Sequence, residues 1–252
     1  MNLGRELVIM AAAFLAGAIN AVAGGGTLVS YPSLVWAGLD PIIANATSTV
    51  ALWPGSLASV FGYRDNMRGA RRWMLRLAPS SIVGGAVGAV LLLMTPSRLF
   101  AELVPWLILG ATALRAANTP ISRVLGRISQ HRETRAWLAG AVVFQFFVAV
   151  YGGYFGAGIG IMMLAAFGLL GMTDIHQMNG LKALFAMGIN GIAAGYFIAR
   201  GAVHWPDALP MAVAAMAGGY LGARLARRLG RKFVHVAVVV IGTTMGIYLL
   251  LR

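Results

Sequence analysis

The sequence predicts an all-α polytopic membrane protein, built from two inverted-topology repeats of about five hydrophobic segments each. Three observations lead to this fold: the apolar composition, the length of the uncharged runs, and an internal repeat whose matching loops differ in charge. Of the 252 residues, 59% are hydrophobic and 11% are charged, whereas soluble domains carry about 25% charged residues. A soluble domain could not cover so much apolar surface, so we expect a membrane protein.

The composition also narrows the chemistry. The chain has 20 Lys and Arg against 7 Asp and Glu, a net charge of +13, which in a soluble protein would suggest a nucleic-acid partner. In so apolar a chain we expect membrane lipid as the partner and no nucleic acid. Cysteine is absent, which excludes disulfides and thiolate chemistry. The four histidines lack the spacing of metal ligands, so we predict no metal and no cofactor.

The uncharged runs define the membrane segments, because about 20 apolar residues span a bilayer as a helix. Two runs, Leu7–Leu39 and Ala136–Thr173, have 33 and 38 residues and are too long for one crossing. Each holds a glycine cluster near its middle, and glycine costs about 1 kcal/mol in a helix interior. We therefore expect both runs to break there. The short pieces 27–39 and 160–171 are candidates for re-entrant or half-helices, so the number of membrane segments is eight to ten.

Ten hydrophobic segments follow from these runs and breaks. They are 5–23, 27–39, 43–63, 75–95, 97–117, 136–152, 157–171, 178–199, 207–224 and 233–251. The first could instead be a signal peptide, because Ala21-Val22-Ala23 resembles a cleavage site. Arg5 lies beside Glu6, however, which is not a basic leader, and the repeat pairs this segment with mid-chain residues. We expect the segment to be retained.

The two halves match at an offset of 133 to 134 residues, as Gly25 matches Gly158. Fifteen of the 20 basic residues fall in three connections, 64–76, 115–135 and 224–232. Cytoplasmic loops carry the excess of Lys and Arg, so all three are expected inside. Their repeat counterparts are almost neutral, which places equivalent loops on opposite sides of the membrane. Each half then crosses an odd number of times, as in an inverted repeat.

This topology predicts one integral membrane domain in three parts. Residues 1–117 form the first repeat half, residues 118–135 a cytoplasmic linker, and residues 136–252 the second half. Both termini are expected on the outer, periplasmic face. Four tryptophans flank the predicted segments and indicate contact with the membrane interface. They are Trp36, Trp73, Trp137 and Trp205.

Several motifs together resemble the TauE/SafE (sulfite exporter) family over nearly the whole chain. The first half carries Asn20-Ala21-Val22-Ala23-Gly24-Gly25-Gly26-Thr27-Leu28, Pro32, Ala44-Asn45-Ala46-Thr47-Ser48 and Gly55-Ser56. The second half carries Gly156-Ala157-Gly158-Ile159-Gly160, Asn179-Gly180-Leu181-Lys182, Asn190 and Gly218-Gly219 with Gly222-Ala223. The resemblance implies a multi-pass bacterial inner-membrane permease with two repeated halves, linked to movement of sulfite and organosulfonates. The second half has Asn179-Gly180-Leu181 where the first has the Thr47-Ser48 pattern.

The glycine breaks are the first candidate substrate site. A broken helix exposes backbone N–H groups at its new N-terminus, and these can bind an anion. The candidates are Gly24, Gly25, Gly26, Gly156 and Gly158. The alternative is that these glycines only allow close helix packing. We expect that second role for Gly84-Gly85 with Gly88 and for Gly218-Gly219 with Gly222.

Lys182 is the one basic residue within a predicted segment, where a charge costs at least about 2.5 kcal/mol and needs a partner or a cavity. An anionic substrate would be such a partner, and snorkelling to the interface is the alternative. At an offset of 133 its counterpart is Thr49. The uncharged polar candidates are Thr47, Ser48 and Asn179, whose alternative is interhelical hydrogen bonding.

The chemistry of these residues indicates a secondary transporter that moves a small anion, sulfite or an organosulfonate, by alternating access. The chain has no phosphate-binding loop for ATP. A passive anion channel and a membrane-embedded enzyme are the alternatives. The enzyme is disfavoured because His131, His176, His204 and His235 are far apart in the sequence. The sequence leaves open the exact substrate, the direction of transport, the coupling ion and the oligomeric state.

Overall fold

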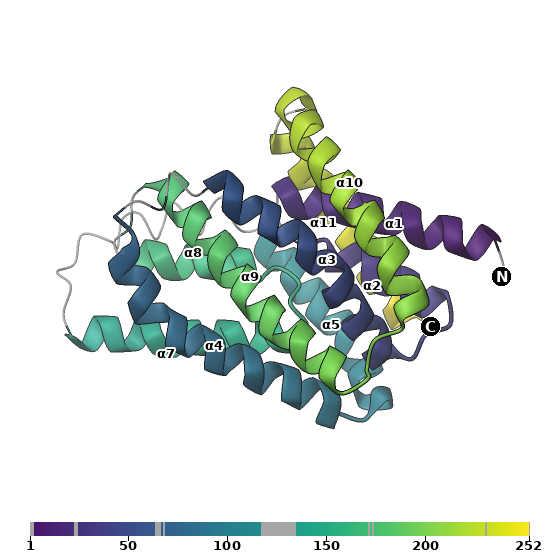
Figure 1. The fold of residues 1–252 in the computed structure, drawn as a ribbon, viewed down its shortest axis with the longest axis horizontal. Helices are drawn as coiled ribbons and strands as arrows, with labels where there is room; N and C mark the ends of the chain where they lie inside the picture. The colour runs from purple at the N-terminus through teal and green to yellow at the C-terminus, as the bar shows by residue number, and fades with distance from the viewer. Residues whose placement is uncertain are drawn as a thin grey trace.

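The computed structural model describes residues 3–22, 25–63, 67, 69–116, 135–170, 172, 174–229 and 231–251 (Figure 1). In this part of the chain the regular structure is helical throughout, which confirms the predicted all-α class. The helices are α1 (Leu3–Val22), α2 (Thr27–Trp36), α3 (Pro41–Tyr63), α4 (Arg71–Met94), α5 (Ser97–Ala116), α7 (Arg135–Tyr154), α8 (Ile159–Leu169), α9 (Ile175–Ala199), α10 (Trp205–Leu229) and α11 (Arg231–Leu250).

Each of these helices coincides with one of the ten predicted segments, but several ends differ. Helix α10 continues to Leu229, although the sequence placed a basic connection from residue 224 onward. Helix α4 begins at Arg71, four residues before its predicted start. Arginine and lysine are good helix formers and keep their charge in water while their stems follow an apolar surface. The helices therefore run past the uncharged stretches that were used to find them.

Five of the described helices are long and apolar enough to cross a membrane. These spans are Leu3–Ala21, Arg71–Met94, Ser97–Leu114, Ala136–Tyr154 and His176–Ala199. The chain is a multi-pass membrane protein, and a total of eight to ten segments stays a prediction. Helices α2 and α8 have 10 and 11 residues, which is about half of the 20 that a full crossing needs. Both are half-helices by length.

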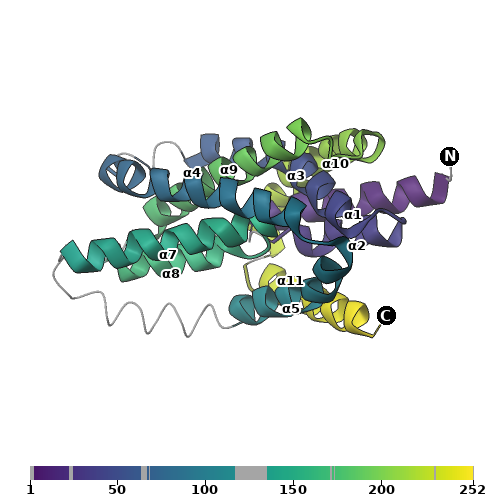
Figure 2. The same cartoon turned by 90° about the horizontal axis from the view of Figure 1, so that it is seen from below.

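The helices form two bundles that do not follow the order of the chain (Figures 1 and 2). Bundle A consists of α1, α2, α3 and α10, and bundle B consists of α4, α7, α8 and α9. The fourth helix of each sequence half therefore packs on the first three helices of the other half. Bundle B has its own apolar core, and the core of bundle A extends to α5 and α11, which pack on each other.

Glycines set the closest approaches within both bundles. A Cβ atom on Gly218 of α10 would overlap the backbone of Phe14 in α1, and one on Gly84 of α4 would overlap the backbone of Phe146 in α7. Gly88 meets the backbone of Val150 in the same way. Small residues let helix backbones approach in membranes. The packing role predicted for Gly84, Gly88 and Gly218 is confirmed.

Polar side chains define both the starts and the interiors of the helices. The Asp40 carboxylate accepts the N–H groups of Ile42 and Ile43 at 2.9 and 3.4 Å. The Asp174 carboxylate accepts those of His176 and Gln177 at 2.8 and 3.2 Å. These are N-caps of α3 and α9, the arrangement that aspartate favours. Inside bundle B, Gln145 of α7 donates to Ser81 of α4 at 2.9 Å.

One predicted interface tryptophan is placed differently. Trp73 is buried, with 3% of its surface exposed, and it belongs to the core of bundle B. The guanidinium carbons of Arg72 and Arg76 lie 4.8 and 5.7 Å from its ring centre, within the range of cation–π contact. The interface prediction for Trp73 was wrong because its flanking arginines stack on the ring instead of marking a lipid boundary. Trp36 and Trp205 are exposed.

Candidate functional site

The break between α7 and α8 is built by two glycines. Helix α7 ends at Tyr154 and α8 begins at Ile159. Gly156 and Gly158 have φ angles of +81° and +78°, a left-handed conformation that side-chain-bearing residues rarely adopt. The sequence therefore located this break correctly, and these two residues shape its backbone.

Side chains from three helices contact this break. Asn45 of α3 donates its amide N–H to the Tyr154 carbonyl at 3.0 Å. Tyr151 of α7 donates its hydroxyl to the Ala157 carbonyl at 2.8 Å. Asn190 of α9 lies beside Gly156, with its amide oxygen 3.6 Å from where a Cβ would be. Irregular backbone at membrane depth survives only when protein or a water-filled cavity covers it, and these three side chains provide that cover.

Lys182 of α9 lies across the first turn of α8. Its stem passes Gly160 so closely that a Cβ there would be 3.0 Å from the lysine Cδ. The ammonium group donates to the Asn179 side-chain oxygen at 2.9 Å, one turn earlier in α9. The first turn of a helix carries about half a positive charge and unpaired N–H groups. The structure thus places an ammonium group next to a second positive centre.

The first break, between α1 and α2, is arranged differently. Gly25 has a φ of +99°, and the N–H of Gly26 donates to the Asn20 side chain at 3.3 Å. A Cβ on Gly26 would overlap the backbone of Ala16 in α1, so Gly26 also has a packing role. The candidate Gly24 lies outside the described residues.

The remaining polar candidates make interhelical hydrogen bonds within bundle A. The hydroxyls of Ser48 in α3 and Ser30 in α2 are 2.6 Å apart, and both residues are buried. The hydroxyl of Thr47 accepts the backbone N–H of His204, in the segment before α10, at 3.0 Å. Ser48 therefore faces α2, and Thr47 joins α3 to the start of α10. The second break is contacted from α3 by Asn45, which the sequence alone did not rank among the candidates.

A buried aromatic cluster connects the second break to α2. The rings of Tyr31 in α2 and Phe155 in the break have centres 5.9 Å apart, and the ring of Phe100 in α5 lies 6.1 Å from Tyr31. Tyr154 packs on Phe100 at 5.5 Å. All four contact edge to face, the arrangement that aromatic quadrupoles favour. Movement of α2 relative to the second break would have to rearrange these rings.

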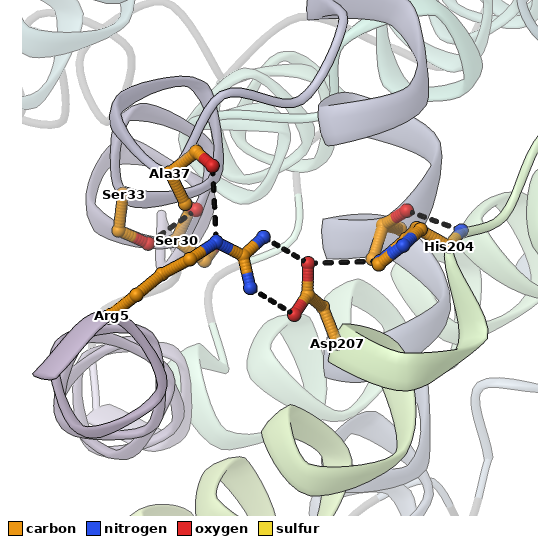
Figure 3. A network of polar contacts seen from close by, with 7 residues as sticks. Arg5, Ser30, Ser33, Ala37, His204 and Asp207 are labelled. Carbon is orange, nitrogen blue, oxygen red and sulfur yellow. Dashed lines mark hydrogen bonds and ion pairs between the residues drawn. The ribbon is translucent and has the colours of Figure 1, made fainter. Parts of the chain in front are cut away.

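Sequence reasoning missed an ionic network at the start of α10 (Figure 3). The Arg5 guanidinium donates to both oxygens of Asp207 at 2.9 and 2.8 Å and to the carbonyl of Ala37, at the end of α2, at 3.0 Å. The His204 ring lies 2.9 Å from the Asp207 carboxylate. Asp207 is only 5% exposed, and the network joins α1, α2 and α10. One available signal was that Asp207 is an acidic residue at the edge of an apolar run in a very basic chain.

These arrangements support binding and not a catalytic metal centre. In the part of the chain that the structure describes, no three His, Asp or Glu residues are grouped as metal ligands would be. The positive features converge on the N-terminal end of α8, where Gly158, Lys182 and Asn179 lie. Backbone N–H groups and an ammonium group are the donors that anions favour.

Comparisons with known proteins agree with this membrane architecture. Residues 9–249 match the family described as "Sulfite exporter TauE/SafE". The chain is 26% identical to a "Probable membrane transporter protein ORF9" of Sinorhizobium, over 96% of this chain and 91% of that one. It is 29% identical to a "Probable membrane transporter protein" of Haemophilus influenzae, over 97% and 95%. It is 28% identical to the "Probable membrane transporter protein YfcA" of Escherichia coli K12, over 96% and 88%. No solved structure matches the chain.

Proposed function

Since this chain belongs to the sulfite exporter TauE/SafE family and is a membrane transporter, we propose that it moves a small anion, sulfite or an organosulfonate. Transport is secondary and uses alternating access, and the bacterial inner membrane is its location. The anion binds at the second break, next to the first turn of α8. Gly156, Gly158, Asn179 and Lys182 contribute to the site.

The contact between Lys182 and Gly160 carries this proposal. Two positive centres, an ammonium group and a helix N-terminus, lie together within the apolar part of the chain. A charge in a bilayer costs at least about 2.5 kcal/mol, and two of the same sign repel each other. An anion between them would reduce both costs, and the Asn179 amide would hold the ammonium in place. Half-helix N-termini that face anionic substrates are a recurring feature of transporters.

The two halves form an inverted repeat in this proposal, and the α5–α11 pair supports it. These helices begin 134 residues apart, at Ser97 and Arg231. Gly242 packs on Thr112, and Gly246 packs on Ile108, so α5 and α11 run antiparallel. Helices related by an axis along the membrane normal would run parallel, whereas an axis in the membrane plane makes them antiparallel. Both termini are then on the outer face if the basic connections are cytoplasmic.

Alternating access follows from the two bundles. Bundle A and bundle B are held together internally by close glycine contacts, so each is suited to move as one body. Rocking of one bundle against the other would open the second break first to one side and then to the other. The aromatic cluster around Phe155 lies between α2 of bundle A and this break, where it would separate the two sides.

Uptake of labelled sulfite and sulfonates into proteoliposomes tests the proposal. We expect saturable flux, and counterflow in which internal unlabelled substrate accelerates entry of labelled substrate, which a passive channel does not show. Lys182→Met should raise KM at least tenfold, and Lys182→Arg should raise it less, because the charge is retained. Arg98→Gln is the control, because Arg98 is exposed and pairs only with exposed Glu102 in the described structure. Folded protein without flux of any anion would overturn the function, and an unchanged KM in Lys182→Met would overturn the site.

A further inference from the structure

Helices α3 and α9 can be aligned by their caps. Asp40 and Asp174 bind the backbone N–H groups two and three residues later in the same way. Counting five residues from each cap gives Asn45 in α3 and Asn179 in α9. This alignment is one residue off the offset of 133 used for the sequence, and it makes Ser48, not Thr49, the counterpart of Lys182.

The two asparagines have different partners. The side-chain oxygen of Asn179 accepts a hydrogen bond from the Lys182 ammonium at 2.9 Å. Asn45 is 1% exposed, and its amide nitrogen donates to the Tyr154 carbonyl. Its side-chain oxygen has no hydrogen-bond partner among the described residues. Leaving a buried acceptor unpaired costs about 1 to 3 kcal/mol, so this oxygen is suited to a ligand that the protein itself does not supply.

The surroundings of Asn45 favour a positive ligand. Its amide binds the carbonyl of Tyr154, the last residue of α7, and the C-terminal end of a helix carries about half a negative charge. Ser48, one turn further along α3, adds a buried hydroxyl oxygen to the same part of the bundle. Oxygen atoms at the C-terminal ends of half-helices coordinate the coupling ions of several transporters. The chemistry here is that of a monovalent cation and not of an anion.

We propose that a monovalent cation, Na⁺ or K⁺, binds the side-chain oxygen of Asn45 beside the end of α7. It takes the place that the Lys182 ammonium occupies at Asn179 in the other half. The second break would then hold a cation at the end of α7 and an anion at the start of α8. The role of this cation as the coupling ion rests on the proposed transport function, whereas its binding does not.

Thermal unfolding of the purified protein in detergent tests binding without any anionic substrate. N-methyl-D-glucamine chloride is replaced stepwise by NaCl or KCl at constant ionic strength. A ligand that binds only the folded state raises the unfolding temperature by mass action. We expect the bound cation to raise Tm by about 5 °C near saturation and the other cation to raise it less. A Tm that neither salt changes would overturn the proposal.

Three variants locate the effect. Asn45→Asp adds a negative charge to the site and should lower the half-maximal cation concentration at least tenfold. Asn45→Leu should abolish the response. Gln145→Leu is the matched control and should keep it, because Gln145 also has a buried unpartnered amide oxygen but lies within α7, away from a helix end. A response that is the same in Asn45→Asp and in the wild type would overturn the site.

A fourth variant tests the comparison with Lys182. Ser48→Lys places an ammonium group one turn from Asn45, as in α9, and should make Tm insensitive to the cation. A Ser48→Lys protein that folds and still responds like the wild type would overturn the proposed equivalence. In proteoliposomes, an inward cation gradient should raise anion uptake in the wild type and not in Asn45→Leu. Cation-dependent Tm without anion flux would reject the transport proposal and keep the cation site, so the two failures are distinguishable.

Discussion

Bundles A and B share one framework of helices but are secured by different chemistry where their paired helices begin. Arg5 of α1 and Asp207 of α10 are each the third residue of their helices and form a two-contact ion pair. The third residues of α7 and α4 are Trp137 and Trp73. Trp73 is buried in the core of bundle B. The same positions thus hold a directional ionic contact in one bundle and apolar aromatic side chains in the other.

This difference determines how each bundle can respond to movement. The Arg5 guanidinium binds Asp207 and the Ala37 carbonyl simultaneously, so α1, α10 and the end of α2 are fixed in one geometry. An ion pair that is withdrawn from water loses much when its geometry is disturbed. Burial of tryptophan is not directional and tolerates small displacements. Bundle A should therefore behave as the more rigid body at this end, and one substitution should be enough to loosen it.

Removing the Asp207 charge is the largest expected effect. Asp207→Asn leaves the Arg5 guanidinium without its anionic partner in a largely buried site, and we expect a loss of about 2 to 3 kcal/mol in the free energy of unfolding. The value is below that of a fully buried pair because the Arg5 side chain is 28% exposed. Denaturant unfolding of the detergent-solubilised protein, followed by tryptophan fluorescence, measures the loss.

Two further variants separate the ion pair from general damage. Arg5→Met combined with Asp207→Leu removes both charges and should recover most of the stability, because apolar pairs often replace buried ion pairs without cost. Glu102→Gln breaks the exposed pair with Arg98 and should change stability by less than about 0.5 kcal/mol. A loss in Asp207→Asn no larger than that in Glu102→Gln would show that the two bundles are not secured differently.

Local sequence features predicted most of the helices but not their partners. The uncharged runs and glycine clusters located each described helix, because membrane length and glycine conformation are local properties. The exchange of α4 and α10 between the halves depends on which surfaces meet, and no spacing in the sequence encodes that choice. Gly84 and Gly218 were predicted as packing residues, yet the carbonyl that each one meets lies in a helix of the opposite half.

The candidate site shows the same division. Lys182 and Asn179 are three residues apart on one helix, the spacing at which side chains meet, so the sequence could bring them together. Asn45 and Tyr154 are 109 residues apart, and Arg5 and Asp207 are 202 apart. Such contacts follow from the tertiary fold. The capping role of Asp40 and Asp174 also shifted the register between α3 and α9, which changed the counterpart of Lys182.

The glycine crossings should be equally sensitive in both bundles. In Gly84→Ala and Gly218→Ala, the added methyl group overlaps the backbone of Phe146 and Phe14 respectively, and overpacking of this kind costs about 1 to 3 kcal/mol. Thermal unfolding should give losses that agree within about 1 kcal/mol. Gly110→Ala is the control, because a Cβ there meets nothing within 4 Å and alanine favours a helix. A loss confined to one crossing would show that only that bundle depends on close contact.

The helix caps provide the smallest and most symmetric test. Asp40→Ala and Asp174→Ala each remove a carboxylate that accepts two backbone N–H groups, and loss of such a cap costs about 1 kcal/mol. The two losses should be similar, because the cap geometry is the same in α3 and α9, and the double variant should show their sum within about 0.5 kcal/mol. Asp40→Asn and Asp174→Asn should be nearly neutral, since asparagine caps as well as aspartate. If these carboxylates instead carried protons during transport, the asparagine variants would be stable but would lose the pH dependence of anion flux. Unchanged pH dependence in stable asparagine variants would confine both residues to capping, and would leave the difference between the bundles to the Arg5–Asp207 network and the tryptophans.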